Sequence, residues 1–218
     1  MIFTILSHIK DSLILFIFGL IFLIPFQILI RHKALKENMS INRLHIISVL
    51  LFLYIIILMF GFTGIPSVQV VLKYGVLTSN GLNFQQDQIN IIPLRWIGSG
   101  VLTYIENIIL FMPLGFLLPF IWEKYESIWK TSLFGLFLSF LIEFSQLFNW
   151  RVSDIDDLMM NTIGTVFGYL IFKLFCTRYY ALNNKIPGIV YNKKFSIILN
   201  QEAYLYVIIA FCTKIFFS

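Results

Sequence analysis

Carboxylate and amide side chains are the groups through which this chain could bind or transform another molecule, and they are sparse. Of 218 residues, only 11 are Asp or Glu. Glu106 and Glu143 each stand inside an apolar run, where an ionisable group is costly and usually faces protein or a water-filled cavity. Gln146 lies one helical turn after Glu143 and therefore beside it. Carboxylate and amide side chains placed in this way indicate a binding site for a polar or cationic group.

A second polar group follows at Ser153-Asp154-Ile155-Asp156, which fits a capping box at the start of a helix. In this motif Ser153 accepts a hydrogen bond from a first-turn N–H group while Asp156 reaches back. A helix beginning there places Asp154, Asp157 and Asn161 on one face. Alternatively, Asp154 and Asp156 only cap the helix and oppose its dipole.

Membrane helices must position these residues. The chain is 59% hydrophobic and 12% charged, about half the charged share of a soluble domain. This excludes a soluble enzyme with a detachable catalytic module and a nucleic-acid binder. Apolar runs of about 20 residues predict one all-α polytopic transmembrane bundle over residues 1–218, with six spans, or five if the last lies in the interface. The predicted spans are residues 12–30, 44–62, 101–121, 131–148, 157–176 and 201–217.

Lys and Arg residues set the expected orientation, because cytoplasmic loops carry the excess of them. With six spans, eleven of the 16 Lys and Arg residues fall on one side, which predicts both termini outside the cell. The net charge of +5 is then a topology signal. Residues 63–100 form a long outer connection, whose apolar part, 89–97, we expect at the membrane surface. Residues 176–218 hold a cytoplasmic loop and the weak last span.

This orientation places Glu106 and Glu143 at the same depth, roughly 7–8 Å below the outer surface at about 1.5 Å per residue. We therefore expect a pocket open to the outside, with Arg151 at its rim. Glu143 and Arg151 could instead form a structural ion pair, and Glu106 could be protonated and hydrogen-bonded to the backbone. The expected ligand-binding residues are Glu106, Glu143, Gln146, Arg151, Asp154, Asp157 and Asn161.

Helix packing is expected at Gly164 and Gly168, whose spacing permits close helix contact, and at Gly115. Pro113 stands in the middle of a predicted span, where it frees a backbone carbonyl and bends the helix.

No cofactor or metal is expected. A divalent cation held by the carboxylates of Asp154, Asp156 and Asp157 is the alternative. The three histidines show no ligand spacing, and we expect them to be plain interfacial residues. They are His8, His32 and His45.

Several stretches, in this order, resemble the VanZ-like family of small bacterial membrane proteins. They are Asn90-Ile91-Ile92-Pro93-Leu94, residues 106–116, residues 141–148, Arg151, residues 154–157 and residues 161–165. The resemblance covers a core of about residues 90–175. It implies a bacterial plasma-membrane protein similar to one that lowers susceptibility to the lipoglycopeptide teicoplanin.

Three functions are consistent with these features. The first is a non-catalytic cell-envelope or antibiotic-susceptibility factor whose outer acidic pocket binds a lipid or antibiotic headgroup. The second is a membrane-embedded enzyme that uses carboxylates on a lipid-linked envelope substrate. The third is a small lipid or solute transporter. The sequence contains no nucleophile motif, phosphate loop or internal repeat, which favours the first. The expected partners are the lipid bilayer and an envelope lipid or a lipoglycopeptide, and no nucleic acid.

Overall fold

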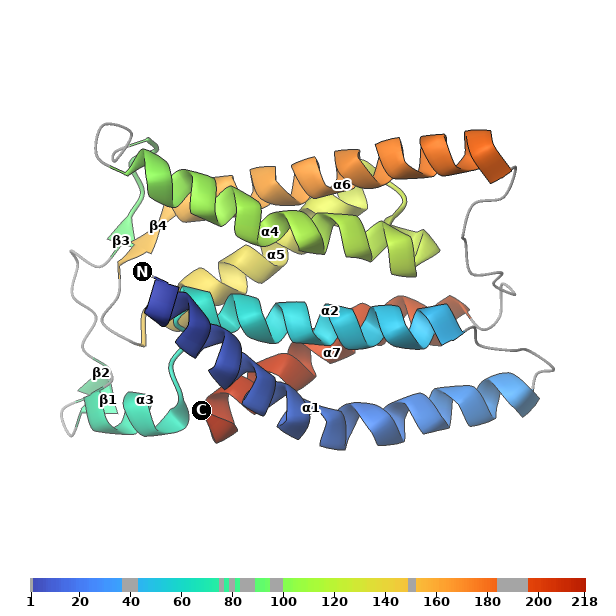
Figure 1. The fold of residues 1–218 in the computed structure, drawn as a ribbon. Helices are drawn as coiled ribbons and strands as arrows, with labels where there is room; N and C mark the ends of the chain where they lie inside the picture. Colours follow the sequence, from blue (N-terminus) through green and yellow to red (C-terminus); the bar gives the residue numbers. More distant parts are fainter. Residues whose placement is uncertain are drawn as a thin grey trace.

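Long helices make up the protein, and they run roughly side by side with both termini at the same end (Figure 1). The computed structural model describes residues 2–36, 43–74, 77–78, 81–82, 89–94, 100–148, 152–183 and 196–218. The long helices are α1 (Ile2–Lys36), α2 (Arg43–Thr63), α4 (Val101–Ile121), α5 (Ile128–Gln146), α6 (Ile155–Asn183) and α7 (Ser196–Phe217).

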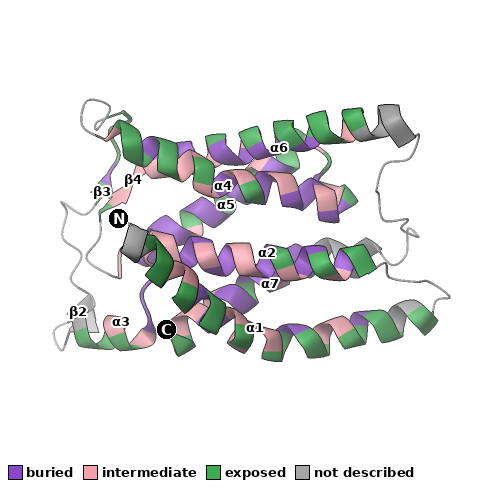
Figure 2. Cartoon of the chain, in the orientation of Figure 1, coloured by how far each residue is buried: buried purple, intermediate pink, exposed green. Residues whose placement is uncertain are grey.

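Five of these helices are long and apolar enough to cross a membrane, with spans at Ile5–His32, Arg43–Lys73, Val101–Ile121, Ile128–Gln146 and Ile155–Arg178. Their outer faces carry exposed apolar residues such as Ile17, Leu29 and Ile47, while the buried residues face inward (Figure 2). An apolar outer face is stable in lipid and not in water. The predicted all-α membrane bundle is confirmed.

Helix α7 is not among those five apolar segments, yet it belongs to the bundle. It packs against α1 and α2, and Ala203, Tyr206 and Ala210 on it are completely buried. The weak apolar run at 201–217 is therefore part of a longer helix whose inner face contributes to the core.

The bundle has two groups of helices. Helices α4 and α6 share the most extensive contact, and α5 packs on α6. Helices α1, α2 and α7 pack together, and α2 joins the groups through α4. Phe52 of α2, Phe111 of α4 and Trp122 just after α4 lie in the common core.

The connection between α2 and α4 carries structure of its own. It contains α3 (Val68–Tyr74), an antiparallel pair of β1 (Leu77–Thr78) with β2 (Gly81–Leu82), and β3 (Ile89–Asn90). Strand β3 pairs in parallel with β4 (Ser153–Asp154), so that Asn90 stands opposite Asp154. Ile91 and Ile92 are exposed, and residues 95–97 of the predicted surface segment lie outside the described residues. A 3-10 turn at Glu123–Tyr125 joins α4 to α5.

Candidate functional site

A cavity of about 660 Å³ lies where α2 and α5 end and where α4 and α6 begin. The structure brings five of the sequence-predicted residues together in its wall: Glu106, Glu143, Gln146, Asp157 and Asn161. The rest of the wall consists of Ile5, His8, Phe62, Thr63, Thr103, Asn107, Ile109 and Leu110. A polar cavity at one end of an apolar bundle is therefore the candidate site.

The wall between α4 and α6 is held by a hydrogen bond between side chains. The Asn107 Nδ2 atom donates to Asp157 Oδ1 at 2.6 Å. Glu106, the neighbour of Asn107 on α4, is exposed. Asn107 was not among the predicted site residues, although its place next to Glu106 could have indicated it.

The α5 side of the cavity is formed by buried polar residues with structural partners. Glu143 is 5% exposed, and its Oε2 atom accepts a hydrogen bond from the backbone N–H of Asp154 at 2.9 Å. Gln146 Nε2 donates to the backbone oxygen of Thr63 at 3.0 Å. These two residues line the cavity, and they also connect the end of α5 to the N-cap of α6 and to the end of α2.

Asn161 satisfies only one of its two polar atoms. Its Nδ2 atom donates to Ser139 Oγ at 2.9 Å, whereas its buried Oδ1 atom has no hydrogen-bond partner within the described part of the chain. A buried acceptor without a donor is destabilising, and such atoms are common where a ligand binds.

The predicted capping box at the start of α6 is wrong in its assignment of residues. Asp154 Oδ1 accepts a hydrogen bond from the N–H of Asp156 at 2.9 Å and another from Asn90 Nδ2 at 2.9 Å. Asp154 is thus the N-cap, because the pairing of β4 with β3 holds Ser153 in the strand. Asp154 is not among the residues that line the cavity.

Asp156 does not reach back to Ser153 but holds the segment that precedes α4. Its carboxylate is completely buried, and it accepts hydrogen bonds from Tyr104 Oη at 2.6 Å and from the backbone N–H of Leu94. Leu94 has a φ of 59°, a conformation that is costly for a residue other than glycine. The carboxylate therefore stabilises a turn that leucine would not adopt on its own.

We expect Asp156→Ala to lower the free energy of unfolding by about 1–3 kcal/mol for each donor left without an acceptor. Asp156→Asn, which keeps one acceptor oxygen, should cause a smaller loss. Thermal unfolding of the purified protein in detergent measures both effects. Glu123→Ala, which removes an exposed carboxylate, is the matched control. Equal melting temperatures for the Asp156→Ala and Glu123→Ala variants would contradict this role.

Acidic groups dominate the electrostatics of the cavity. Glu106, Glu143 and Asp157 line it, whereas no Lys or Arg is present among its described lining residues. Arg151, predicted at the rim, lies outside the described residues. His8 is the one described lining residue that can become cationic; its ring packs on Phe62 at 5.2 Å between centroids. The expected interfacial location of His8 stays a prediction, and nothing in the sequence near the start of α1 indicates the contact with Phe62.

The divalent cation considered as an alternative stays a prediction, and the three aspartates that would hold it have separate hydrogen-bond partners. The Asp154, Asp156 and Asp157 carboxylates accept from Asn90, Tyr104 and Asn107, respectively. No group of three or more potential ligands occurs in the described ranges. These three residues therefore serve three different local contacts.

Glycines set the distance between α4 and α6, and hence the cavity wall. A Cβ atom added to Gly115 would lie 1.9 Å from the backbone oxygen of Thr165. At Gly164 it would lie 2.3 Å from the backbone oxygen of Ile108, and at Gly168 2.0 Å from that of Met112. Backbone atoms cannot be approached so closely, so the two helices touch through glycine.

The fourth predicted packing residue, Pro113, faces outward and is exposed, and α4 continues through it. The bend expected at Pro113 stays a prediction.

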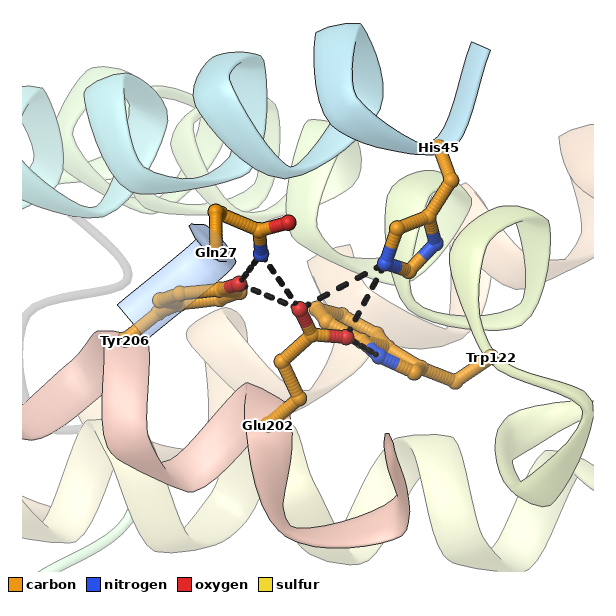
Figure 3. Close-up of polar contacts among 5 residues, drawn as sticks. All are labelled: Gln27, His45, Trp122, Glu202 and Tyr206. Atoms are coloured by element: carbon orange, nitrogen blue, oxygen red, sulfur yellow. Dashed lines mark hydrogen bonds and ion pairs between the residues drawn. The ribbon is translucent and has the colours of Figure 1, made fainter. Parts of the chain in front are cut away.

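A second polar cluster, not predicted from the sequence, lies near the opposite end of the bundle, where α2 begins and α4 ends. It consists of Gln27, His45, Trp122, Glu202 and Tyr206 (Figure 3). Glu202 of α7 is completely buried and forms an ion pair with His45 of α2, with 3.1 Å between Nε2 and Oε2. Trp122 Nε1 donates to Glu202 Oε2 at 2.9 Å, and Gln27 Nε2 donates to Glu202 Oε1 at 2.7 Å. Tyr206, one turn after Glu202, also donates to it.

His45, expected to be a plain interfacial residue, is instead buried within the protein, with only 1% of it exposed. Its burial is made possible by Glu202, which supplies a carboxylate inside the bundle. The one available signal was an acidic residue in the last apolar run, with Tyr206 four residues later on the same face.

The comparisons with known proteins bear on the same part of the chain. The VanZ/LLP1 family model matches residues 49–176, which include the cavity residues from Phe62 to Asn161 and amount to more than half of the chain. In the searches of curated proteins and of solved structures, nothing matches this chain. With five helices that are long and apolar enough to cross a membrane, the chain belongs to the VanZ/LLP1 family and is a multi-pass membrane protein.

Proposed function

We propose that this protein is a non-catalytic factor of the bacterial cell envelope whose cavity binds the polar headgroup of an envelope lipid or of a lipoglycopeptide antibiotic. The observation that carries this proposal is the set of three carboxylates, those of Glu106, Glu143 and Asp157, around one cavity at an end of the bundle. Ionisable residues at membrane depth are costly and usually functional. A volume of about 660 Å³ lies in the range of small-ligand sites.

The proposal places the cavity on the outer side of the plasma membrane. Eleven of the 16 Lys and Arg residues belong to the opposite, cytoplasmic side if the chain crosses six times. The positions of both termini at the cavity end are consistent with that number of crossings (Figure 1). A headgroup in the outer leaflet, or an antibiotic arriving from outside, could reach such a cavity.

The test is teicoplanin susceptibility of a bacterial host that expresses the protein. We expect the native chain to raise the inhibitory concentration and the Glu106→Gln, Asp157→Asn double variant to lose most of that increase. Charge-assisted hydrogen bonds contribute about 1.5–3 kcal/mol each, so removing them should weaken binding by about tenfold or more.

The matched control is a Glu123→Gln, Glu126→Gln double variant, which neutralises two exposed carboxylates in the connection between α4 and α5, away from the cavity. Membrane levels of all variants are compared by immunoblot. The proposed function would be overturned if the host expressing the Glu106→Gln, Asp157→Asn variant at normal membrane levels had the same teicoplanin susceptibility as the host expressing the native chain.

A further inference from the structure

The hydrogen-bonding groups of the cavity indicate the chemistry of its occupant. Its three amide side chains already use their nitrogen atoms as donors to the protein: Asn107 to Asp157, Gln146 to Thr63 and Asn161 to Ser139. Each of these NH2 groups keeps one further hydrogen, whereas the ionised carboxylate of Glu106 and the Oδ1 atom of Asn161, both on residues of the wall, can only accept.

Two acceptors of the wall have no hydrogen-bond partner among the described residues. The buried Oδ1 atom of Asn161, a residue only 2% exposed, has no hydrogen-bond partner within the described ranges. No hydrogen bond or ion pair to the Glu106 carboxylate occurs among the described residues either, and Glu106 is exposed. A ligand that satisfies both must donate hydrogen bonds, and a positive charge on it would be favoured by Glu106, Glu143 and Asp157. A primary ammonium group has three N–H donors and a compact positive charge.

The way into the cavity has apolar sides. Ile5 of α1 and Ile109 of α4 line it and are 41% and 59% exposed. Leu102 and Ile105 are also exposed and continue the same face of α4 as Ile109. Helix α1 packs mainly on α2 and α7, and Ile5 near its start lines the same cavity as Ile109 of α4. An apolar chain could therefore lie along α4 while a polar head enters the cavity.

We propose that the occupant is an amphiphile with a primary ammonium in its headgroup, bound with the ammonium at Glu106 and Asn161 Oδ1 and the apolar chain along Leu102, Ile105 and Ile109. This inference rests on the proposed function and deepens it by naming the ligand class. Because Glu106, Glu143 and Asp157 are all acidic, an anionic headgroup without an amine should bind more weakly at this site.

The experiment is isothermal titration calorimetry on the full chain in neutral detergent with four probes. They are short-chain phosphatidylethanolamine, phosphatidylcholine and phosphatidylglycerol with identical acyl chains, and free ethanolamine. We expect phosphatidylethanolamine to bind about tenfold or more tightly than each of the other three. The Glu106→Gln variant should lose that preference, whereas Glu123→Gln should keep it. Because Glu106 is exposed, its substitution should leave the melting temperature unchanged.

Each other outcome overturns a part of the inference. Equal binding of phosphatidylcholine would show recognition of charge without N–H donors, and equal binding of phosphatidylglycerol would show that no amine is recognised. Equal binding of free ethanolamine would remove the role of the apolar strip. Suppose that the native chain binds all four probes equally, or binds none, while the Glu106→Gln, Asp157→Asn double variant still loses the teicoplanin effect. The ligand class is then wrong and the proposed function stands. If both assays show no effect, both fail.

Discussion

Glu202→Ala is expected to lower the free energy of unfolding by about 3–5 kcal/mol, the usual cost of removing one partner of a buried ion pair. The substitution leaves His45 buried without its carboxylate. It also removes the acceptor of the hydrogen bonds from Gln27, Trp122 and Tyr206. Because these residues come from α1, α2, α7 and the end of α4, four segments lose a common contact at once (Figure 3).

Chemical or thermal unfolding of the purified protein in detergent measures this effect. Gln201→Ala, which changes the exposed neighbour of Glu202, is the matched control and should alter stability by less than about 0.5 kcal/mol. The stability of Glu202→Gln should lie between those of Glu202→Ala and Gln201→Ala, since the amide keeps one acceptor oxygen and loses the charge. A Glu202→Ala protein as stable as Gln201→Ala would show that the cluster does not hold α7 in the bundle.

The helices were predictable because a lipid environment imposes a simple requirement on sequence. A span needs about 20 apolar residues, and the predicted run at 101–121 has the same bounds as α4. The ends were less accurate where helices extend past the apolar part, as α1 does to Lys36 and α6 to Asn183. Backbone hydrogen bonding continues there although the hydrophobic signal has ended.

The cavity wall was predictable for a related reason. Glu106 stands near the start of one span and Glu143 near the end of the next, so alternation of direction places both near the same face. Helical periodicity adds Asp157 and Asn161, and all four line the cavity. That they bind a ligand stays a prediction.

Contacts between residues far apart in the chain could not be predicted in this way. His45 and Glu202 are separated by 157 residues, and nothing in the local pattern of either helix requires that they meet. The role of Asp156 likewise depends on the pairing of β3 with β4. Two-residue strands have no periodicity that could reveal them. Ser153 and Asp156 were therefore assigned to a capping box, which the pairing of Ser153 in β4 prevents.

Gly168→Ala is the second substitution for which we expect a large loss of stability, about 1–3 kcal/mol or more. The added Cβ atom would lie 2.0 Å from the backbone oxygen of Met112 and 2.9 Å from the backbone nitrogen of Phe116. Side chains can rotate away from a clash, but these atoms belong to the α4 backbone, so α4 and α6 must separate. This contact is the most extensive between any two helices of the described structure.

Gly19→Ala is the control, because its Cβ atom would meet only side-chain atoms, the nearest being Leu53 Cδ2 at 3.3 Å, Ile57 Cδ1 at 3.4 Å and Thr213 Oγ1 at 3.7 Å. Alanine also favours a helix more than glycine does. Separation of α4 from α6 should also lengthen the 2.6 Å contact between Asn107 and Asp157 and open the cavity wall. Gly168→Ala should therefore weaken ligand binding in the calorimetric assay as well as lower the melting temperature, although Gly168 lies outside the cavity. A variant with a native melting temperature would show that α4 and α6 can move apart at no cost, and a destabilised variant with native binding would show that their spacing does not set the site.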